Sequence, residues 1–139
     1  MEEFYSLSRM APPMSLSASP LTTIIPVRDG ERSRKFYEES LGLPFQGEAA
    51  SGNLVFTLAG SGSLELLKDP AATPSVHTTA SFEVKDLASM ISDLGKQGVV
   101  FEDYDLPGLK TTDHIAVMES EKAAWFKDPD GNVLCLHEG

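Results

Sequence analysis

The sequence is poor in cysteine, in basic residues and in long apolar runs, and each shortage excludes a class of protein. Cys135 is the only cysteine of 139 residues, so the chain cannot form an internal disulfide, and a reducing, cytoplasmic location is expected. Eleven basic residues stand against 21 acidic ones, and the resulting charge of −10 does not suit a nucleic-acid partner. No stretch approaches the roughly 20 apolar residues of a membrane-spanning helix, so no membrane partner is expected.

The length and the distribution of proline indicate one folded domain behind a tail. Serine and proline dominate residues 1–20, which are predicted to be disordered. Residues 21–139 are enough for a single domain with its own core. A proline-containing linker divides this domain into two units of about 21–68 and 77–138.

The first unit begins with a strand and a helix. Residues 22–27 are mostly β-branched, which predicts a strand, and Pro26 within them favours either an edge position in the sheet or a bulge. A helix is predicted to follow, with Asp29 as its N-cap, to extend to Leu41 and to end at Gly42.

The second unit repeats this order. A strand is predicted over 78–84, and Asp86 is the expected N-cap of the next helix. Gly98 ends that helix, and a further strand is predicted over 99–102. One apolar face of the helix is formed at amphipathic spacing by Leu87, Met90, Ile91 and Leu94.

Matching residues show that the two units are copies of one plan. In their first parts the copies are offset by 57 residues: Val27-Arg28-Asp29 matches Val84-Lys85-Asp86. In their closing strands the offset is 70: Phe56 matches Phe126, and Leu64-Glu65-Leu66 matches Leu134-Cys135-Leu136. Two copies at so long a period indicate a pseudo-symmetric α+β domain of tandem βαβββ units.

Two motifs carry a resemblance to a known family. They are the helix exit Phe36-Tyr37 with Leu41-Gly42-Leu43, and the hairpin turn Asp128-Pro129-Asp130-Gly131-Asn132. With the repeat, they resemble the vicinal oxygen chelate superfamily of glyoxalase I, bleomycin-resistance proteins and extradiol dioxygenases over about residues 21–138. The resemblance implies a concave, partly closed mixed sheet with helices outside. It also implies a homodimer in which two chains complete each cavity.

The resemblance places the family's metal-ligand positions on Thr22, Glu65, Thr79 and Cys135. Glu65 alone has the ligand chemistry of the family, whereas a catalytic metal normally takes at least three ligands from His, Cys, Asp or Glu. We therefore expect no metal or other cofactor. Whether the chain is an enzyme stays open, with no assigned catalytic residues beyond Glu65 as a candidate general base.

A displaced metal site is the alternative. His77 lies two residues before Thr79 and His137 two after Cys135, so each shares a strand face with a ligand position. If those two strands are antiparallel neighbours, His77 and His137 face each other, and a divalent metal would bind there together with Glu65.

A concave, aromatic-lined ligand pocket is predicted from the remaining candidates. Glu65 is either a base or cation anchor, or a carboxylate hydrogen-bonded to Thr22; Cys135 is interpreted as a small buried residue rather than a reactive thiol. The loop over 102–111 is either a lid, with Tyr104 and His114 at its edges, or an ordered connection. The predicted pocket residues are Thr22, Phe56, Glu65, Thr79, Tyr104, His114, Trp125 and Cys135.

Three functions are compatible with this sequence. The first is a metal-independent protein that holds a small organic molecule, as bleomycin-resistance proteins do. The second is a metal-dependent lyase or isomerase of the glyoxalase I type with an atypical metal site. The third is a regulatory or interaction module whose pocket is vestigial.

Overall fold

The computed structural model describes residues 15–139, so most of the predicted tail lies outside the described residues. The first unit forms one four-stranded sheet, called sheet A. Its strands are β1 (Thr22–Val27), β2 (Phe45–Glu48), β3 (Leu54–Thr57) and β4 (Ser63–Lys68), in the order β1-β4-β3-β2. β1 pairs with β4 in parallel at the edge of the sheet, where the missing N–H of Pro26 leaves no ladder bond unmade. The predicted edge strand is confirmed.

The second unit forms sheet B on the same plan. Its strands are β5 (Thr78–Glu83), β8 (Ala116–Met118), β9 (Glu121–Lys127) and β10 (Val133–Glu138), in the order β5-β10-β9-β8. β5 and β10 are parallel, and the remaining neighbours are antiparallel. The loop before β8 carries a short ladder of β6 (Asp105–Leu106) and β7 (Leu109–Lys110).

The strand predicted over 99–102 is wrong. In this segment only Phe101 pairs with another strand, through an isolated bridge to Phe126. Phe101 is anchored instead by its side chain, whose ring meets that of Phe126 at 5.3 Å. Packing in the core therefore holds this segment without a regular ladder.

The helices begin and end where their caps predict. Helix α2 (Gly30–Lys35) continues into a π-helical turn, η1 (Phe36–Ser40), and α3 spans Leu87–Lys96. The Asp29 carboxylate accepts the Arg32 N–H at 3.2 Å, and the Asp86 carboxylate accepts the Ser89 N–H at 3.0 Å. Gly42 follows the first helical segment with a φ of 76° that side chains rarely adopt.

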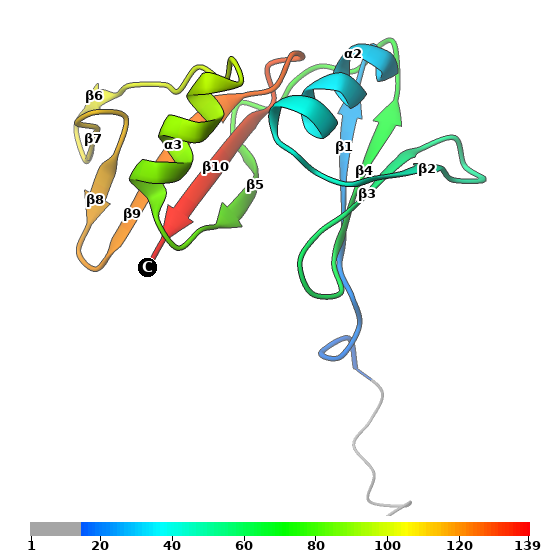
Figure 1. Cartoon of the computed structure of the whole chain (residues 1–139), viewed down its shortest axis with the longest axis horizontal. Coiled ribbons are helices and arrows are strands. Elements are labelled where there is room, and N and C mark those ends of the chain that lie inside the picture. Colours follow the sequence, from blue (N-terminus) through cyan, green and yellow to red (C-terminus); the bar gives the residue numbers. More distant parts are fainter. Residues whose placement is uncertain (1–14) are drawn as a thin grey trace, which may run out of the picture.

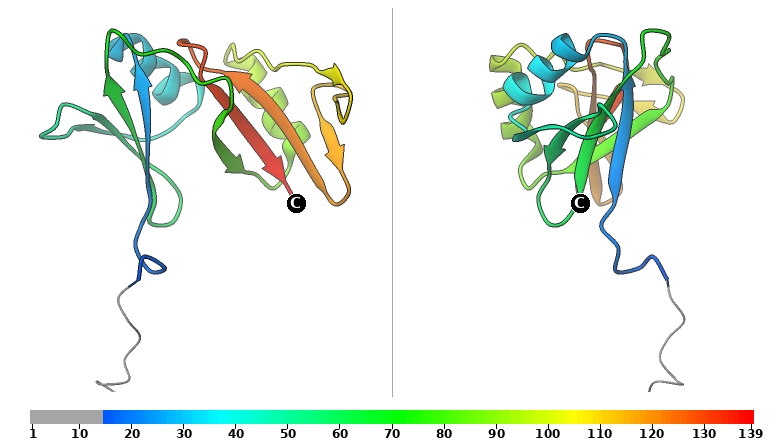
Figure 2. Two further views of the ribbon diagram at one scale, coloured as in Figure 1. Left: turned by 180° about the vertical axis from the view of Figure 1, so that it is seen from behind. Right: turned by 90° about the vertical axis from the view of Figure 1, so that its right-hand side faces the viewer.

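Figure 1 shows the two sheets as the arms of an open V, with α3 lying across sheet B; Figure 2 shows the same arrangement from two other sides. The fold is thus α+β, with two mixed sheets that do not close into a barrel. The core fills the helix-facing sides of both sheets and includes fully buried Tyr37, Phe56 and Phe126. None of the helices in residues 15–139 is long and apolar enough to cross a membrane.

The turn that closes the second unit also binds the first unit. Asp128 is 5% exposed, and its carboxylate accepts the Tyr37 hydroxyl at 2.7 Å and the Asn132 side-chain amide at 2.9 Å. It also accepts the backbone N–H groups of Asp130 and Asn132. The four bonds satisfy a carboxylate that would otherwise be costly to bury.

Asp130 makes a second set of contacts to the first unit. Its carboxylate accepts the Arg28 backbone N–H at 2.8 Å and the Arg28 Nε–H at 2.9 Å, together with the Ser33 hydroxyl at 3.3 Å. We call Asp128, Asp130 and Asn132 the inter-unit lock. These residues set how the two sheets sit relative to each other.

Candidate functional site

Each sheet has one face toward the core and one face away from it, which we call the open face. In β4, Leu64 and Leu66 are buried on the core side, so Glu65 between them points to the open face. In β10, Leu134 and Leu136 occupy the core side in the same way. The residue between them, Cys135, is on the open face of sheet B.

The open face of sheet A has a carboxylate in an apolar row. Glu65 lies between Ile24 on β1 and Val55 on β3. Its Oε1 accepts a hydrogen bond of 3.0 Å from the side-chain amide of Asn53. The interpretation of Glu65 as a partner of Thr22 is wrong, because the Thr22 hydroxyl bonds that of Ser63 at 3.0 Å. The parallel register of β1 and β4 sets Thr22 opposite Ser63.

The open face of sheet B has an aromatic surface in the equivalent row. Cys135 lies between Ser81 on β5 and Trp125 on β9. The Tyr104 ring meets the Trp125 ring edge to face at 5.6 Å, and the Trp125 indole N–H donates to the Thr78 hydroxyl at 3.2 Å. The indole is therefore held by two neighbours while staying partly exposed. Partly exposed, positioned aromatic rings of this kind suit a flat organic ligand.

Polar groups lie beside this aromatic surface. The Ser81 hydroxyl and His137 Nδ1 are 2.6 Å apart on the open face of sheet B. Cys135 is 6% exposed, and burial raises the pKa of its thiol. Burial also raises the pKa of Tyr104, with further contributions from Glu102 and Cys135. At neutral pH the thiol and the phenol are therefore neutral, and the site offers hydroxyl, imidazole and aromatic groups rather than anions.

The structure separates the predicted pocket residues into groups. Tyr104, Trp125 and Cys135 come together on sheet B, and Thr79 lies on β5 of the same sheet. Thr22 and Glu65 are on sheet A. The assignment of Phe56 to the pocket is wrong, and His114 lies in a different cavity.

Phe56 is fully buried in the core, on the face of sheet A opposite Glu65. Its repeat partner, Phe126, is fully buried as well. The repeat offset of 70 could have predicted this, because it pairs Phe56 with Phe126 and Val55 with Trp125. By that pairing Val55, and not Phe56, occupies the position on sheet A that Trp125 has on sheet B.

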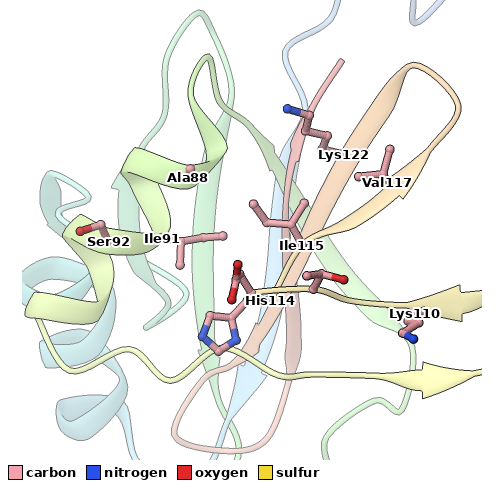
Figure 3. Close-up of a pocket in the computed structure, with 10 residues that line it drawn as sticks. Ala88, Ile91, Ser92, Lys110, His114, Ile115, Val117 and Lys122 are labelled. Atoms are coloured by element: carbon pink, nitrogen blue, oxygen red, sulfur yellow. The ribbon is translucent and has the colours of Figure 1, made fainter.

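His114 lies away from the Tyr104–Trp125 pair, in a cavity between α3 and the loop before β8. Its Nδ1 is 3.1 Å from the Asp103 carboxylate, and its ring centre lies 6.1 Å from that of Phe101, with the two rings tilted by 35°. Figure 3 shows the His114 ring in this cavity with Ile91 and Ile115. A larger groove of about 920 Å³ lies between the units and is lined by residues that include Leu43, Thr57, Phe82 and Met90.

The displaced His77–His137 metal site is also wrong. It required antiparallel pairing of the two strands, but β5 and β10 are parallel. His77 precedes the start of β5, beside the Val133 end of β10, whereas His137 pairs with Glu83 at the other end. The two imidazoles are therefore at opposite ends of the sheet.

The donor set at the family's ligand positions does not fit a catalytic metal ion. Two of the four positions carry neutral threonine hydroxyls, which leaves Cys135 and a Glu65 carboxylate that is already bonded by Asn53, fewer than the three ligands a catalytic metal normally takes. Over residues 15–139, no group of three or more His, Cys, Asp or Glu side chains is arranged to hold a metal.

Asn53 and Ser81 are the site residues that the sequence analysis missed. Ser81 lies two residues after Thr79 on the same strand, so strand periodicity was a sufficient signal for it. Asn53 precedes β3 and reaches Glu65 across the pairing of β3 with β4. That contact depends on the pairing register, which a single sequence does not contain.

Comparisons with known proteins agree with this architecture. The sequence model of the Glyoxalase/Bleomycin resistance protein/Dioxygenase superfamily matches residues 19–136. Among curated protein sequences, none matches the chain. A solved structure from Bacillus anthracis, assigned to the glyoxalase family, is similar with a TM-score of 0.72 at 19% identity, covering 92% of this chain and 99% of that one.

Two further solved structures are similar. A member of the glyoxalase/bleomycin resistance protein/dioxygenase superfamily from Sphaerobacter thermophilus has a TM-score of 0.68 at 22% identity, covering 90% of this chain and 100% of that one. TnmS3, an antibiotic binding protein from Streptomyces sp. CB03234, has a TM-score of 0.66 at 27% identity, covering 91% and 98%.

Proposed function

The chain belongs to the Glyoxalase/Bleomycin resistance protein/Dioxygenase superfamily, and from this premise we propose that it binds a small organic molecule on the open face of sheet B without a metal ion. The observation that carries the proposal is the Tyr104–Trp125 pair, which stands beside Cys135 where the family resemblance places a metal ligand. The likeness to TnmS3, an antibiotic binding protein, supports the same class of function.

The donor chemistry supports metal independence. Threonine hydroxyls do not ionise near neutral pH, so Cys135 and Glu65 are the only two ligands of the usual kind at the four positions, one fewer than a catalytic metal normally takes. Glu65 would have to exchange its bond from Asn53 for a metal with no strong partner ligand nearby. We propose instead that Glu65, on sheet A of a second copy of the chain, attracts or orients a polar group of the ligand.

The chemistry of the site favours a flat, aromatic ligand that carries a positive charge. Trp125 and Tyr104 offer ring faces and edges for stacking. The chain carries a net charge of −10, which raises the local concentration of cations near its surface. Ser81 and His137 provide hydrogen-bonding groups at the edge of the aromatic surface.

We also propose that two copies of the chain complete the site. A small-molecule site usually encloses most of its ligand, and an open sheet face cannot do so alone. Beside Glu65, Ile24 is 51% exposed and Leu67 is 40% exposed, so sheet A offers an apolar surface suited to a second chain. Size-exclusion chromatography with light scattering is expected to give twice the chain mass of 15.0 kDa. A mass of 15.0 kDa at micromolar concentration would contradict the dimer.

Trp125 provides a direct test of binding because it is the only tryptophan in the chain. Titration with doxorubicin and with metal-free bleomycin, both aromatic cations, is expected to change its emission in a saturable way. Trp125→Phe removes the signal but keeps a ring, so calorimetry on that variant is the control. If neither probe nor a wider library of aromatic antibiotics changes the emission or the melting temperature, the vestigial-pocket function is supported instead.

A further inference from the structure

We propose that the cavity between α3 and the loop before β8 is a second binding site, which takes a small organic anion with a short apolar body. The cavity has a volume of about 730 Å³. It lies on the other side of sheet B from the Tyr104–Trp125 surface. Successive residues of a strand point to opposite faces of the sheet. Val117 and Lys122, which pair across β8 and β9, line the cavity, whereas the adjacent pair Ala116 and Ala123 does not. The proposal is therefore independent of the function proposed above.

The floor of the cavity is apolar. Ile91 and Ala88 reach it from α3, and Ile115 and Val117 from the strand side. Figure 3 shows Ile91 and Ile115 pointing toward each other across this space. The two side chains are only partly buried, so apolar surface remains available to a ligand. A purely ionic guest, such as inorganic phosphate, would leave this surface unused.

The rim of the cavity carries positive charge in an otherwise acidic protein. Lys110 and Lys122 both line it. Lys110 makes no ion pair with any other residue that the structure describes, and Lys122 makes only a long ion pair, with its ammonium 3.9 Å from the Glu138 carboxylate. Asp113 is the one carboxylate that lines the cavity, while Asp103 and Glu138 at its margin are already bonded to His114 and Lys122. The Lys110 ammonium, which pairs with none of these carboxylates, is the group that an anionic ligand complements best.

A strained turn presents His114 to the cavity. Asp113 and His114 have φ values of 53° and 72°, and two consecutive non-glycine residues rarely share this region. The Asp103 carboxylate accepts the His114 backbone N–H at 3.1 Å and the Thr111 hydroxyl at 3.1 Å, while bonding His114 Nδ1. Strain that neighbouring contacts hold in place is typical of binding sites.

The bond to Asp103 determines what His114 offers. With Nδ1 held by a carboxylate, the imidazole is oriented as a donor on that side, and Nε2 is left for another partner. The Phe101 ring lies beside the imidazole, with the ring centres 6.1 Å apart. Lys110 and Lys122 thus flank an apolar floor with ammonium groups that donate hydrogen bonds to a carboxylate, while His114 offers Nε2 as an acceptor to a hydroxyl or amide N–H of the ligand.

The test is an NMR titration of the full ¹⁵N-labelled chain with benzoate, phenylacetate and the neutral isostere benzamide. The carboxylates are expected to shift the amide signals of His114, Ile115 and Val117 in a saturable way, and benzamide is expected to bind about tenfold more weakly. Equal binding of benzamide would overturn the charge assignment. Shifts confined to Trp125 and its neighbours, or no saturable shift, would overturn the site.

Matched variants separate charge from shape. Lys110→Gln and Lys122→Gln are each expected to weaken carboxylate binding about tenfold. Lys127→Gln is the control, because it removes the same charge from β9 on the opposite face of the sheet, where Lys127 is 4.0 Å from Glu102. Ala88→Phe is expected to fill the cavity and abolish binding without changing any charge. If Lys122→Gln and Ala88→Phe, tested as single variants, both leave benzoate binding unchanged, the proposal is contradicted.

Discussion

The two closing hairpins occupy equivalent places in the two units but present different chemistry. On sheet A the row across the open face is Ile24, Glu65 and Val55, a carboxylate between apolar side chains. On sheet B the equivalent row is Ser81, Cys135 and Trp125, with Tyr104 packed on the indole. The duplicated plan fixes where each row lies. The residues in it decide that the second row is an aromatic surface and the first an apolar row with one carboxylate.

The turns of the two hairpins differ as much as their strands. The turn between β3 and β4, residues 58–62, contains no charged side chain and is mostly exposed. The turn between β9 and β10 buries Asp128, Asp130 and Asn132 against the first unit. One copy of the hairpin thus only closes its sheet, whereas the other also joins the two units. Four predictions, taken from the largest expected effect to the smallest, test this difference between the units.

Asp128→Ala is expected to lower the free energy of unfolding by about 4 kcal/mol, because it removes a buried acceptor of four hydrogen bonds. Ser61→Ala in the exposed turn of the first unit is expected to change it by less than about 0.5 kcal/mol. Urea unfolding measures both. If Asp128→Ala proves too unstable to purify, Tyr37→Phe removes one of the bonds and should cost about 1–3 kcal/mol. Equal effects at Asp128 and Ser61 would refute the lock.

Trp125→Ala is expected to weaken binding of an aromatic ligand about 30-fold, or roughly 2 kcal/mol, because the indole supplies most of the exposed aromatic surface. The counterpart by repeat position is Val55→Ala on sheet A, which should change affinity less than about threefold. Isothermal calorimetry with doxorubicin compares the two. A larger loss at Val55 would place the ligand on sheet A.

Asp130→Asn is expected to cost about 2 kcal/mol at neutral pH, because Arg28 loses a charged partner. Burial alone would raise the pKa of Asp130, but its hydrogen bonds and charge interaction with Arg28 hold that pKa below its ordinary value. The resulting stability is present above about pH 4, the unfolded value, and is lost as pH falls through the folded pKa. The difference from wild type should therefore shrink on acidification. A difference that is constant from pH 7 to pH 3 would contradict the ion pair.

Cys135→Ala is expected to change stability by only about 1 kcal/mol or less, since it removes one small buried atom. Because burial raises the pKa of the thiol, its reaction with Ellman's reagent at pH 8 should be slower than that of free cysteine. Tyr104→Ala should speed the reaction by opening the open face of sheet B. Fast labelling of the wild type would show that Cys135 is a reactive thiol after all.

Local patterns in the sequence were sufficient for much of the fold. The N-caps at Asp29 and Asp86, the edge strand with Pro26 and the turn at 128–132 each depend on residues close in the chain. The internal repeat then gave the tandem βαβββ order. These features were predictable because each depends either on residues close together in the chain or on a pattern that occurs in both units.

The errors concern pairing across long distances. Thr22 was expected opposite Glu65, and His77 opposite His137. Because β1 pairs with β4, and β5 with β10, in parallel, neither pair of residues is adjacent. The burial of Phe56 and the lock at Asp128 depend on how the units pack, and a turn-forming motif alone does not reveal that packing. Strand alternation predicts which residues share a face, but not which face meets the core.

The most direct test of the central claim is the emission of Trp125 during titration with metal-free bleomycin, before and after exhaustive dialysis against EDTA. We predict a saturable change with the same dissociation constant in both samples, and no stoichiometric Zn, Ni, Mn or Fe by elemental analysis of the purified protein. Binding that disappears on chelation and returns on addition of one of these metals would contradict metal-independent binding.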